Sequence, residues 1–195
     1  MQIGIVSDTH DDLDAVHAAV ELFESRNVDA VVHCGDFVAP FSVTPFDADF
    51  AFHAVRGNND GEWNVQSAVE SFGTYHGEAA ALSIPRDGDA DGIKGSDRDG
   101  GNGGNGGGND GPVDVAVTHG TSGIVVDALV DCGDYDYVLH GHTHAHGVEE
   151  RAGTVRVNPG GLPIPIDGAD DAFRVATLDT EKSGVDAVAH HVLDG

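Results

Sequence analysis

Positive charge is scarce in this sequence. Among 195 residues, lysine and arginine together number 9, against 34 aspartates and glutamates, and the formal net charge is −25 at pH 7. So few cations disfavour nucleic-acid binding, which depends on cationic contacts to phosphates. Such a surface also repels itself in dilute buffer. Because molar salt shortens the Debye length to about 3 Å, we expect a halophilic source with a salty cytoplasm; an acidic mesophilic protein is the alternative.

Cysteines and long apolar runs are scarce as well. The two cysteines, Cys34 and Cys132, form no C-x-x-C motif, which argues against a disulfide framework and fits a reducing cytoplasm. No apolar stretch approaches the roughly 18 residues that span a membrane. The opening residues MQIGIVSDTH lack the basic and apolar regions of a secretory signal. We therefore expect a cytoplasmic protein without a membrane partner.

Apolar runs alternate with helical patterns along the chain. The runs that predict strands are residues 3–8, 29–36, 49–60, 78–85, 113–120, 135–144, 153–161, 172–179 and 184–193. Residues 11–27 predict a helix capped by Asp11 or Asp12, and residues 122–133 predict a helix closed by Gly133. The apolar face of the first helix consists of Leu13, Val16, Val20 and Phe23. This alternation indicates an α/β fold with a largely parallel sheet and a further mixed sheet.

Residues 86–112 differ in kind from the rest. Glycine and aspartate dominate this segment, and large apolar residues are almost absent. It cannot bury enough surface to offset its ordering entropy, so we expect one disordered loop inserted in a single domain of residues 1–195. The stretch DGDADG resembles the start of a calcium-binding EF-hand loop, but Arg98 stands where the twelfth-position glutamate belongs. Calcium binding is therefore not expected.

Polar residues follow one predicted strand after another. These strand ends are Asp8-x-His10, Gly35-Asp36, Gly57-Asn58-Asn59-Asp60, His119-Gly120 and Gly141-His142-Thr143-His144. Singly, each motif has an ordinary structural explanation, such as a helix cap or a tight turn. Together they favour a ligand site, because such sites lie at the carboxyl ends of strands. Two carboxylates, an amide and four imidazoles suit Mn, Fe, Zn, Ni or Co rather than Ca or Mg alone.

In this order, the motifs resemble those of the calcineurin-like metallophosphoesterases. The length and motif spacing are similar to the small single-domain prokaryotic phosphodiesterases, which are related to a retromer subunit of the same fold. The resemblance implies two mostly mixed β-sheets packed as a sandwich and flanked by helices. It also implies two metal-ligand sets that share one carboxylate. The sets are Asp8, His10 and His144 for one divalent ion and Asn58, His119 and His142 for the other, with Asp36 bridging.

The resemblance further implies a phosphodiesterase in which the two metal ions activate a water molecule to hydrolyse a small phosphodiester. Mn²⁺ is the expected ion, and Zn²⁺, Fe²⁺, Ni²⁺ and Co²⁺ are alternatives. Many family members have a histidine where this chain has Asn59, and that histidine protonates the leaving group or contacts the phosphate. Asparagine is no general acid, but it can donate a hydrogen bond to a phosphate oxygen. We therefore assign catalytic roles to Asn59 and Asp36.

Two histidines and one arginine near the motifs are expected to have supporting roles. His33 and His140 are expected to pack or to orient ligands, and Arg56 is either a cation near the site or a surface residue. Two other functions stay open: a protein-interaction scaffold with little activity, and a nuclease. The complete ligand set favours an enzyme, and the lack of a basic groove disfavours a nuclease. The natural substrate and the oligomeric state, a homo-oligomer included, are left open.

Overall fold

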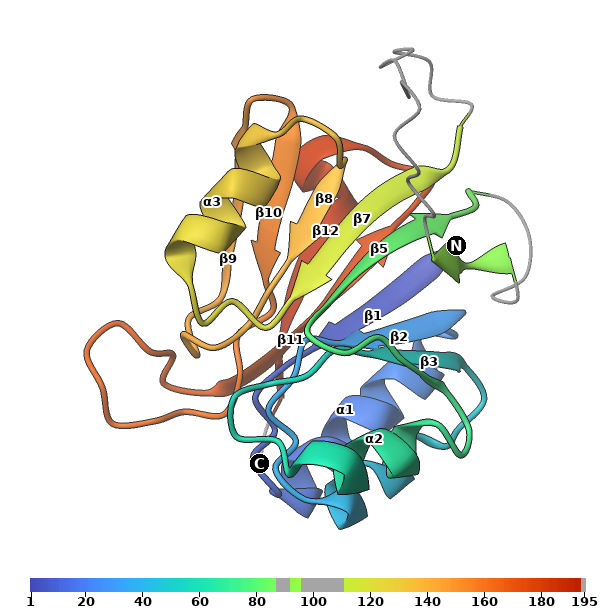
Figure 1. The fold of residues 1–195 in the computed structure, drawn as a ribbon, viewed down its shortest axis with the longest axis vertical. Helices are drawn as coiled ribbons and strands as arrows, with labels where there is room; N and C mark the ends of the chain where they lie inside the picture. Colours follow the sequence, from blue (N-terminus) through green and yellow to red (C-terminus); the bar gives the residue numbers. More distant parts are fainter. Residues whose placement is uncertain (87–91, 96–110, 194–195) are drawn as a thin grey trace.

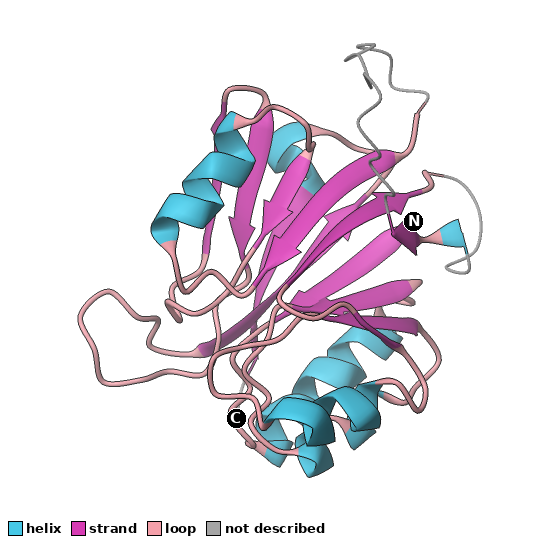
Figure 2. Cartoon of the chain, in the orientation of Figure 1, coloured by secondary structure: helices cyan, strands magenta, loops and turns pink. Residues whose placement is uncertain are grey.

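The computed structural model describes residues 1–86, 92–95 and 111–193. Two six-stranded sheets lie face to face, and helices cover their outer faces (Figure 1). Figure 2 shows the same layers by secondary structure, with the strands in the middle. The predicted α/β sandwich of two mixed sheets is confirmed. No helix in the described ranges has the length and apolar character to cross a membrane.

The first sheet has the strand order β12-β11-β1-β2-β3-β4. Its strands are β1 (Gln2–Val6), β2 (Ala30–His33), β3 (Ala51–Ala54), β4 (Thr74–Tyr75), β11 (Phe173–Asp179) and β12 (Val188–Leu193). The pairs from β1 to β4 are parallel, whereas β11 and β12 pair antiparallel. The carboxyl ends of β1, β2 and β3 therefore lie along one edge.

The second sheet has the order β6-β5-β7-β8-β10-β9. Its strands are β5 (Ala79–Ile84), β6 (Lys94–Gly95), β7 (Val113–Thr118), β8 (Tyr137–Leu139), β9 (Gly147–Arg151) and β10 (Thr154–Asn158). The central strands β7, β8 and β10 are parallel, and antiparallel strands flank them. The two parallel sets deliver the predicted polar motifs where their strands end.

Three α-helices and several short 3₁₀ turns complete the described fold. They are α1 (Leu13–Ser25), α2 (Glu62–Val69) and α3 (Gly123–Asp131), with 3₁₀ turns at Pro40–Ser42, Thr44–Phe46 and Gly184–Ala187. Of the two predicted caps, Asp11 and Asp12, the structure uses Asp12, whose Oδ1 accepts a 3.0 Å hydrogen bond from the backbone N–H of Ala15. Leu13 departs from the predicted apolar face, because this first helical residue is 39% exposed. The sequence patterns also missed α2, β4, β6 and β9.

Two apolar layers hold the strand ends in place. Between the sheets, residues such as Ile5, Val32 and Leu139 form one fully buried cluster. A second cluster, which includes Phe23 and Phe52, fills the space between the first sheet and its helices. Rigid cores on both faces of the first sheet fix the strand ends that carry the polar motifs.

Most of the predicted insertion, residues 87–91 and 96–110, lies outside the described residues. The described part of it differs from the expectation. Ile93 is 9% exposed and belongs to the cluster between the sheets, and Lys94–Gly95 forms β6 by pairing with β5. The prediction used the average composition of the segment, which gives a single apolar residue little weight. One buried isoleucine is nevertheless enough to anchor a short strand. The disorder of the insertion and the single-domain assignment stay predictions.

Replacing Ile93 by alanine should therefore destabilise the protein. Removing a buried isoleucine side chain typically costs about 2–5 kcal/mol, and we expect the low end because β6 lies at a sheet edge. Denaturant unfolding at molar salt measures the change in the free energy of unfolding. Ile124→Ala is the control, because Ile124 is 83% exposed on α3 and should change stability by less than about 0.5 kcal/mol. Equal effects of the two substitutions would refute the anchoring role.

Candidate metal centre

The ends of β1 and β8 bring the first predicted ligand set together. Asp8 and His10 follow β1, and His144 follows β8. One ligand atom from each of the three residues lies within 4.8 Å of the others. The Nε2 of His144 is 3.4 Å from Asp8 Oδ1, and that of His10 is 3.8 Å from the same oxygen. The two imidazole rings stack at 5.0 Å between centroids, so both rings face one carboxylate.

A second cluster adjoins the first through Asp36, which follows β2. Ligand atoms of Asp8, Asp36 and His119 also lie within 4.8 Å of one another. Asp36 Oδ2 is 3.3 Å from the Nε2 of His119 and 3.6 Å from that of His10. Asn58 joins this side, with its Oδ1 3.0 Å from His119 Nε2. Asp36 thus lies within reach of both predicted ligand sets, as a bridging carboxylate must.

His142 is the one predicted ligand that stays at the margin of these clusters. Its ring makes an edge contact with His119 at 5.1 Å between centroids. Its backbone N–H, rather than its ring, binds Asp8, at 2.9 Å from Oδ2. Six of the seven predicted residues therefore meet directly through side chains, and the seventh lies beside them.

Backbone carbonyls set the direction of two of the imidazoles. His119 Nδ1 is 2.8 Å from the carbonyl oxygen of Cys34, and His144 Nδ1 is 2.5 Å from that of Leu162. A carbonyl only accepts, so Nδ1 carries the proton in both rings. Each Nε2 is thereby turned toward the carboxylates, which is the usual way that outer contacts orient a histidine ligand.

The polar strand ends are held in a strained backbone conformation. Five of the predicted ligand residues have positive φ angles between 41° and 69°: Asp8, His10, Asp36, His142 and His144. This left-handed region is unfavourable for residues with a Cβ and is retained where the surroundings fix it. The neighbouring glycines meet a related need, because a Cβ on Gly57 would overlap Asp36 and one on Gly141 would overlap Ser7. The glycines of the motifs therefore allow close chain approach.

Asp60 fixes the turn that presents Asp36. Its buried carboxylate accepts hydrogen bonds from four backbone N–H groups, those of Asp36 (3.2 Å), Phe37 (2.6 Å), Val38 (2.9 Å) and Gly57 (2.7 Å). The sequence interpretation gave this residue no such role. Its place as a carboxylate just after a Gly-Asn turn is the only local signal.

Asn59 is an exposed residue whose amide contacts the Asp36 carboxylate. Its backbone N–H donates to Asp36 Oδ1 and its side-chain amide to Asp36 Oδ2, each at 2.8 Å. Burial alone would raise the pKa of Asp36, but hydrogen bonds from His119 and Asn59 outweigh it and hold that pKa well below its ordinary range. The expected amide donor is therefore committed to Asp36 in this structure.

One buried oxygen shows that a cation fits the centre. Asp8 Oδ1 is the single buried side-chain polar atom among the described residues that has no hydrogen-bond partner. An unsatisfied buried acceptor costs about 1–3 kcal/mol, and an ionised carboxylate oxygen costs more. The imidazoles of His10 and His144 face it. A divalent metal ion held by these three residues would satisfy the oxygen.

Comparison with known proteins identifies the family. The model of the calcineurin-like phosphoesterase superfamily domain matches residues 1–183. The chain belongs to this superfamily. The resemblance drawn from the motifs is confirmed, and with it the interpretation of the chain as a phosphoesterase.

Two archaeal relatives match the phosphoesterase over nearly its full length. Phosphodiesterase MJ0936 of Methanocaldococcus jannaschii is 31% identical over 193 residues, which cover 93% of this chain and 95% of the relative. A probable metallophosphoesterase of Methanothermobacter thermautotrophicus is 26% identical over 191 residues, covering 93% and 88%.

Solved structures confirm the fold of the phosphoesterase. A structure described as a novel archaeal phosphodiesterase superposes with a TM-score of 0.76 at 29% identity, covering 99% of this chain and 100% of the other. A Vps29 variant from Entamoeba histolytica superposes with a TM-score of 0.60 at 14% identity, covering 100% and 99%. The second likeness concerns the fold alone.

The remaining residues near the motifs of the phosphoesterase lie outside the two clusters. His33 stacks on Phe37 at 3.5 Å between ring centroids, and burial lowers its pKa to about 3. His140 is also buried, which lowers its pKa to about 4. Arg56 pairs with the exposed Glu78 at 3.1 Å, so it is a surface residue in this structure.

Metal binding by the phosphoesterase should release protons at neutral pH. The Asp8 and Asp36 carboxylates beside the His10 ring raise its pKa; burial lowers the pKa of His119, but Asp36 and Asp8 raise it overall. A metal ligand must be a neutral imidazole. Metal affinity should therefore fall as pH is lowered through these raised pKa values, which begins above the ordinary value near 6.5. Calorimetric titration in two buffers of different ionisation heat measures the released protons; identical heats would contradict this.

Proposed function

We propose that this phosphoesterase is a phosphodiesterase that uses two divalent metal ions and water to hydrolyse small phosphodiesters. The observation that carries the proposal is the position of Asp36, whose Oδ2 lies 3.6 Å from His10 Nε2 and 3.3 Å from His119 Nε2. A single carboxylate between two imidazole clusters suits a pair of ions with a shared ligand. The likeness to phosphodiesterase MJ0936 supports the diester class.

The proposed ligand sets are those that the motifs suggested. They are Asp8, His10 and His144 for one ion and Asn58, His119 and His142 for the other, with Asp36 bridging. Mn²⁺ is the proposed ion, because carboxylate and amide oxygens accompany the imidazoles and no thiolate takes part. When bound, two such ions polarise phosphoryl oxygens and make water a nucleophile at neutral pH.

Asn59 would act chiefly on Asp36. Its two hydrogen bonds keep the Asp36 carboxylate ionised and fix the orientation of both oxygens. The amide has no proton to give to a departing alkoxide. The leaving group would therefore depart with little help from position 59, and the reaction should favour esters of acidic alcohols.

The acidic composition bears on the setting and the substrate. With a formal charge of −25, the chain is proposed to work in a salty cytoplasm, where screening limits self-repulsion. A small diester is proposed as the substrate in preference to a nucleic acid, because cationic phosphate contacts are scarce. The complete ligand set favours an enzyme over a scaffold of the same fold.

Replacing Asp36 by asparagine should lower the affinity for both metal ions and abolish most of the activity. The amide retains the shape of the side chain but loses the charge that two cations would share. Metal analysis after dialysis, together with hydrolysis of bis(p-nitrophenyl) phosphate, measures both effects. Asp47→Asn is the matched control, since Asp47 is exposed and belongs to neither cluster. Two tightly bound ions and normal turnover in Asp36→Asn would show that Asp36 does not bridge.

Replacing Asn59 by histidine should accelerate hydrolysis most for esters with poor leaving groups. A general acid typically contributes about 10²–10⁴-fold, and an acid limb should appear in the pH–rate profile. The measurement is a series of diesters of rising leaving-group pKa, hydrolysed by both proteins. Equal slopes of log rate against leaving-group pKa would mean that position 59 does not govern protonation.

A further inference from the structure

The loop that carries His142 is held by its backbone and not by the His142 ring. His144, two residues later, is anchored through its ring to the Leu162 carbonyl. The His142 ring makes no hydrogen bond with any residue in the described ranges, although its φ angle of 69° is unfavourable. The direction of this imidazole therefore depends on what fixes the peptides around it.

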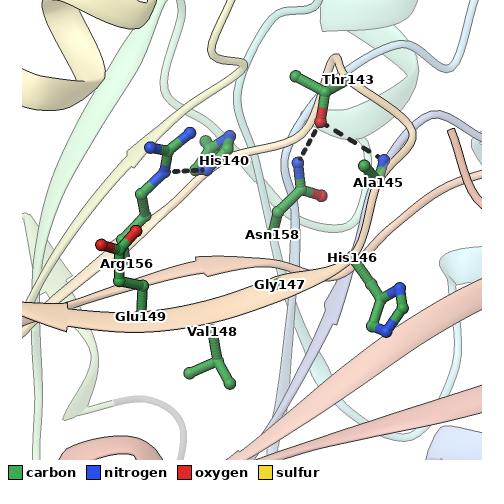
Figure 3. A pocket seen from close by; sticks show the side chains of 9 residues that line it. All are labelled: His140, Thr143, Ala145, His146, Gly147, Val148, Glu149, Arg156 and Asn158. Carbon is green, nitrogen blue, oxygen red and sulfur yellow. Dashed lines mark hydrogen bonds between the residues drawn. The ribbon is translucent and has the colours of Figure 1, made fainter. Parts of the chain in front are cut away.

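The carbonyl of Gly141 is the point at which the loop is fixed. It accepts hydrogen bonds from the backbone N–H of Thr143 (2.9 Å), from Asn158 Nδ2 (3.1 Å) and from His140 Nδ1 (3.2 Å). Asn158 Nδ2 also donates to Thr143 Oγ1 at 2.9 Å, as Figure 3 shows. Asn158 ends β10 and is 4% exposed, so the sheet itself supplies this clamp.

Arg156 sets the orientation of the His140 ring. Its Nε donates to His140 Nε2 at 2.9 Å, the hydrogen bond that a dashed line marks in Figure 3. A guanidinium only donates, so His140 Nε2 is the acceptor and the ring proton lies on Nδ1. That proton faces the Gly141 carbonyl, and Arg156 thus acts on the loop through one intervening ring.

Arg156 makes no ion pair with a carboxylate of residues 1–86, 92–95 or 111–193. Glu149 is its neighbour across the strand pair β9–β10, yet no ion pair or hydrogen bond joins Arg156 to a carboxylate among the described residues. Both side chains line a cavity of about 370 Å³, seen from close by in Figure 3. In a chain with 34 acidic residues, an arginine whose one side-chain partner in the described part of the chain is a histidine indicates a role for its Nε–H.

We propose that Arg156, through His140, and Asn158 are positioning residues that fix the Gly141 carbonyl and thereby aim His142 at the second metal ion. The inference rests on the proposed function, because it takes His142 as a ligand of that ion. It gives the β10 residues behind the loop a role in orienting a ligand of the metal centre. His144, anchored separately, should be affected less.

Two substitutions of Arg156 separate its hydrogen bond from its size. Glutamine places an N–H donor the same number of bonds from Cα as the arginine Nε, whereas methionine places a methyl group there. Arg156→Met should raise the dissociation constant of one of the two metal ions about 10- to 100-fold, the usual loss for outer contacts of a ligand. Arg156→Gln should stay within a few-fold of the unsubstituted protein. Titration of the chelator-treated protein with Mn²⁺ measures both affinities.

Arg151→Met is the control, since Arg151 lies on the neighbouring strand β9 and pairs with exposed aspartates; it should leave both affinities unchanged. Equal affinities in Arg156→Met and the unsubstituted protein, or equal losses in the methionine and glutamine variants, would overturn the inference and leave the proposed function standing. If the unsubstituted protein binds fewer than two metal ions, both the inference and the proposed function are wrong.

A second variant guards against misfolding of Arg156→Met. The midpoint temperature of thermal unfolding of each metal-free variant should lie within a few degrees of that of the metal-free unsubstituted protein. Asn158→Asp keeps the size of the side chain but removes the hydrogen bonds that Nδ2 donates to the Gly141 carbonyl and to Thr143 Oγ1. It should lower the affinity for the same metal ion as Arg156→Met does. Unchanged affinity in Asn158→Asp would overturn the role of that residue.

Discussion

The metal centre depends on one electrostatic constraint, the burial of two carboxylates at the meeting point of two sheets. Asp8 and Asp36 are both buried, and burial without compensation would neutralise them. Imidazoles and amides surround them instead, but one oxygen, Asp8 Oδ1, still lacks a donor. The protein retains an unsatisfied acceptor in its interior, and this is tolerable because a cation completes the set. Metal binding and folding stability are therefore linked.

The same constraint explains the local backbone. Carboxylates from β1 and β2 can share one space only if the chain turns sharply after each strand, and this produces the left-handed conformations of Asp8 and Asp36. The cost is met by contacts that leave no alternative: the Asp60 carboxylate collects four N–H groups of the turn, and Gly57 admits the side chain of Asp36. The hydrogen bonds to the Asp60 carboxylate thus stabilise the strained backbone of the site.

The sequence predicted the features that follow from local patterns. Apolar runs predicted the strands and the α/β class, and the polar strand ends predicted the convergence of the motifs. The two-sheet sandwich came from the resemblance that those motifs carry, and the helix cap was narrowed to Asp11 or Asp12. Features that depend on long-range contacts were missed. The amide of Asn59 turns to Asp36 because of a neighbour 23 positions away. The clamp formed by Arg156 and Asn158 joins β10 to a loop that no spacing rule connects, and β9 is an exposed strand defined only by its pairing with β10.

The surface charge and the buried centre make opposite demands on a phosphodiester substrate. A field of −25 formal charges attracts metal cations but repels an anionic diester, and in dilute buffer it would slow the encounter. At molar salt the Debye length of about 3 Å confines these interactions to direct contacts. The imidazoles of the half-buried His10 and the buried His119 lie within 4 Å of Asp36, so close that salt screens these interactions far less. High salt therefore removes the long-range barrier to the substrate and leaves the short-range electrostatics of the centre intact.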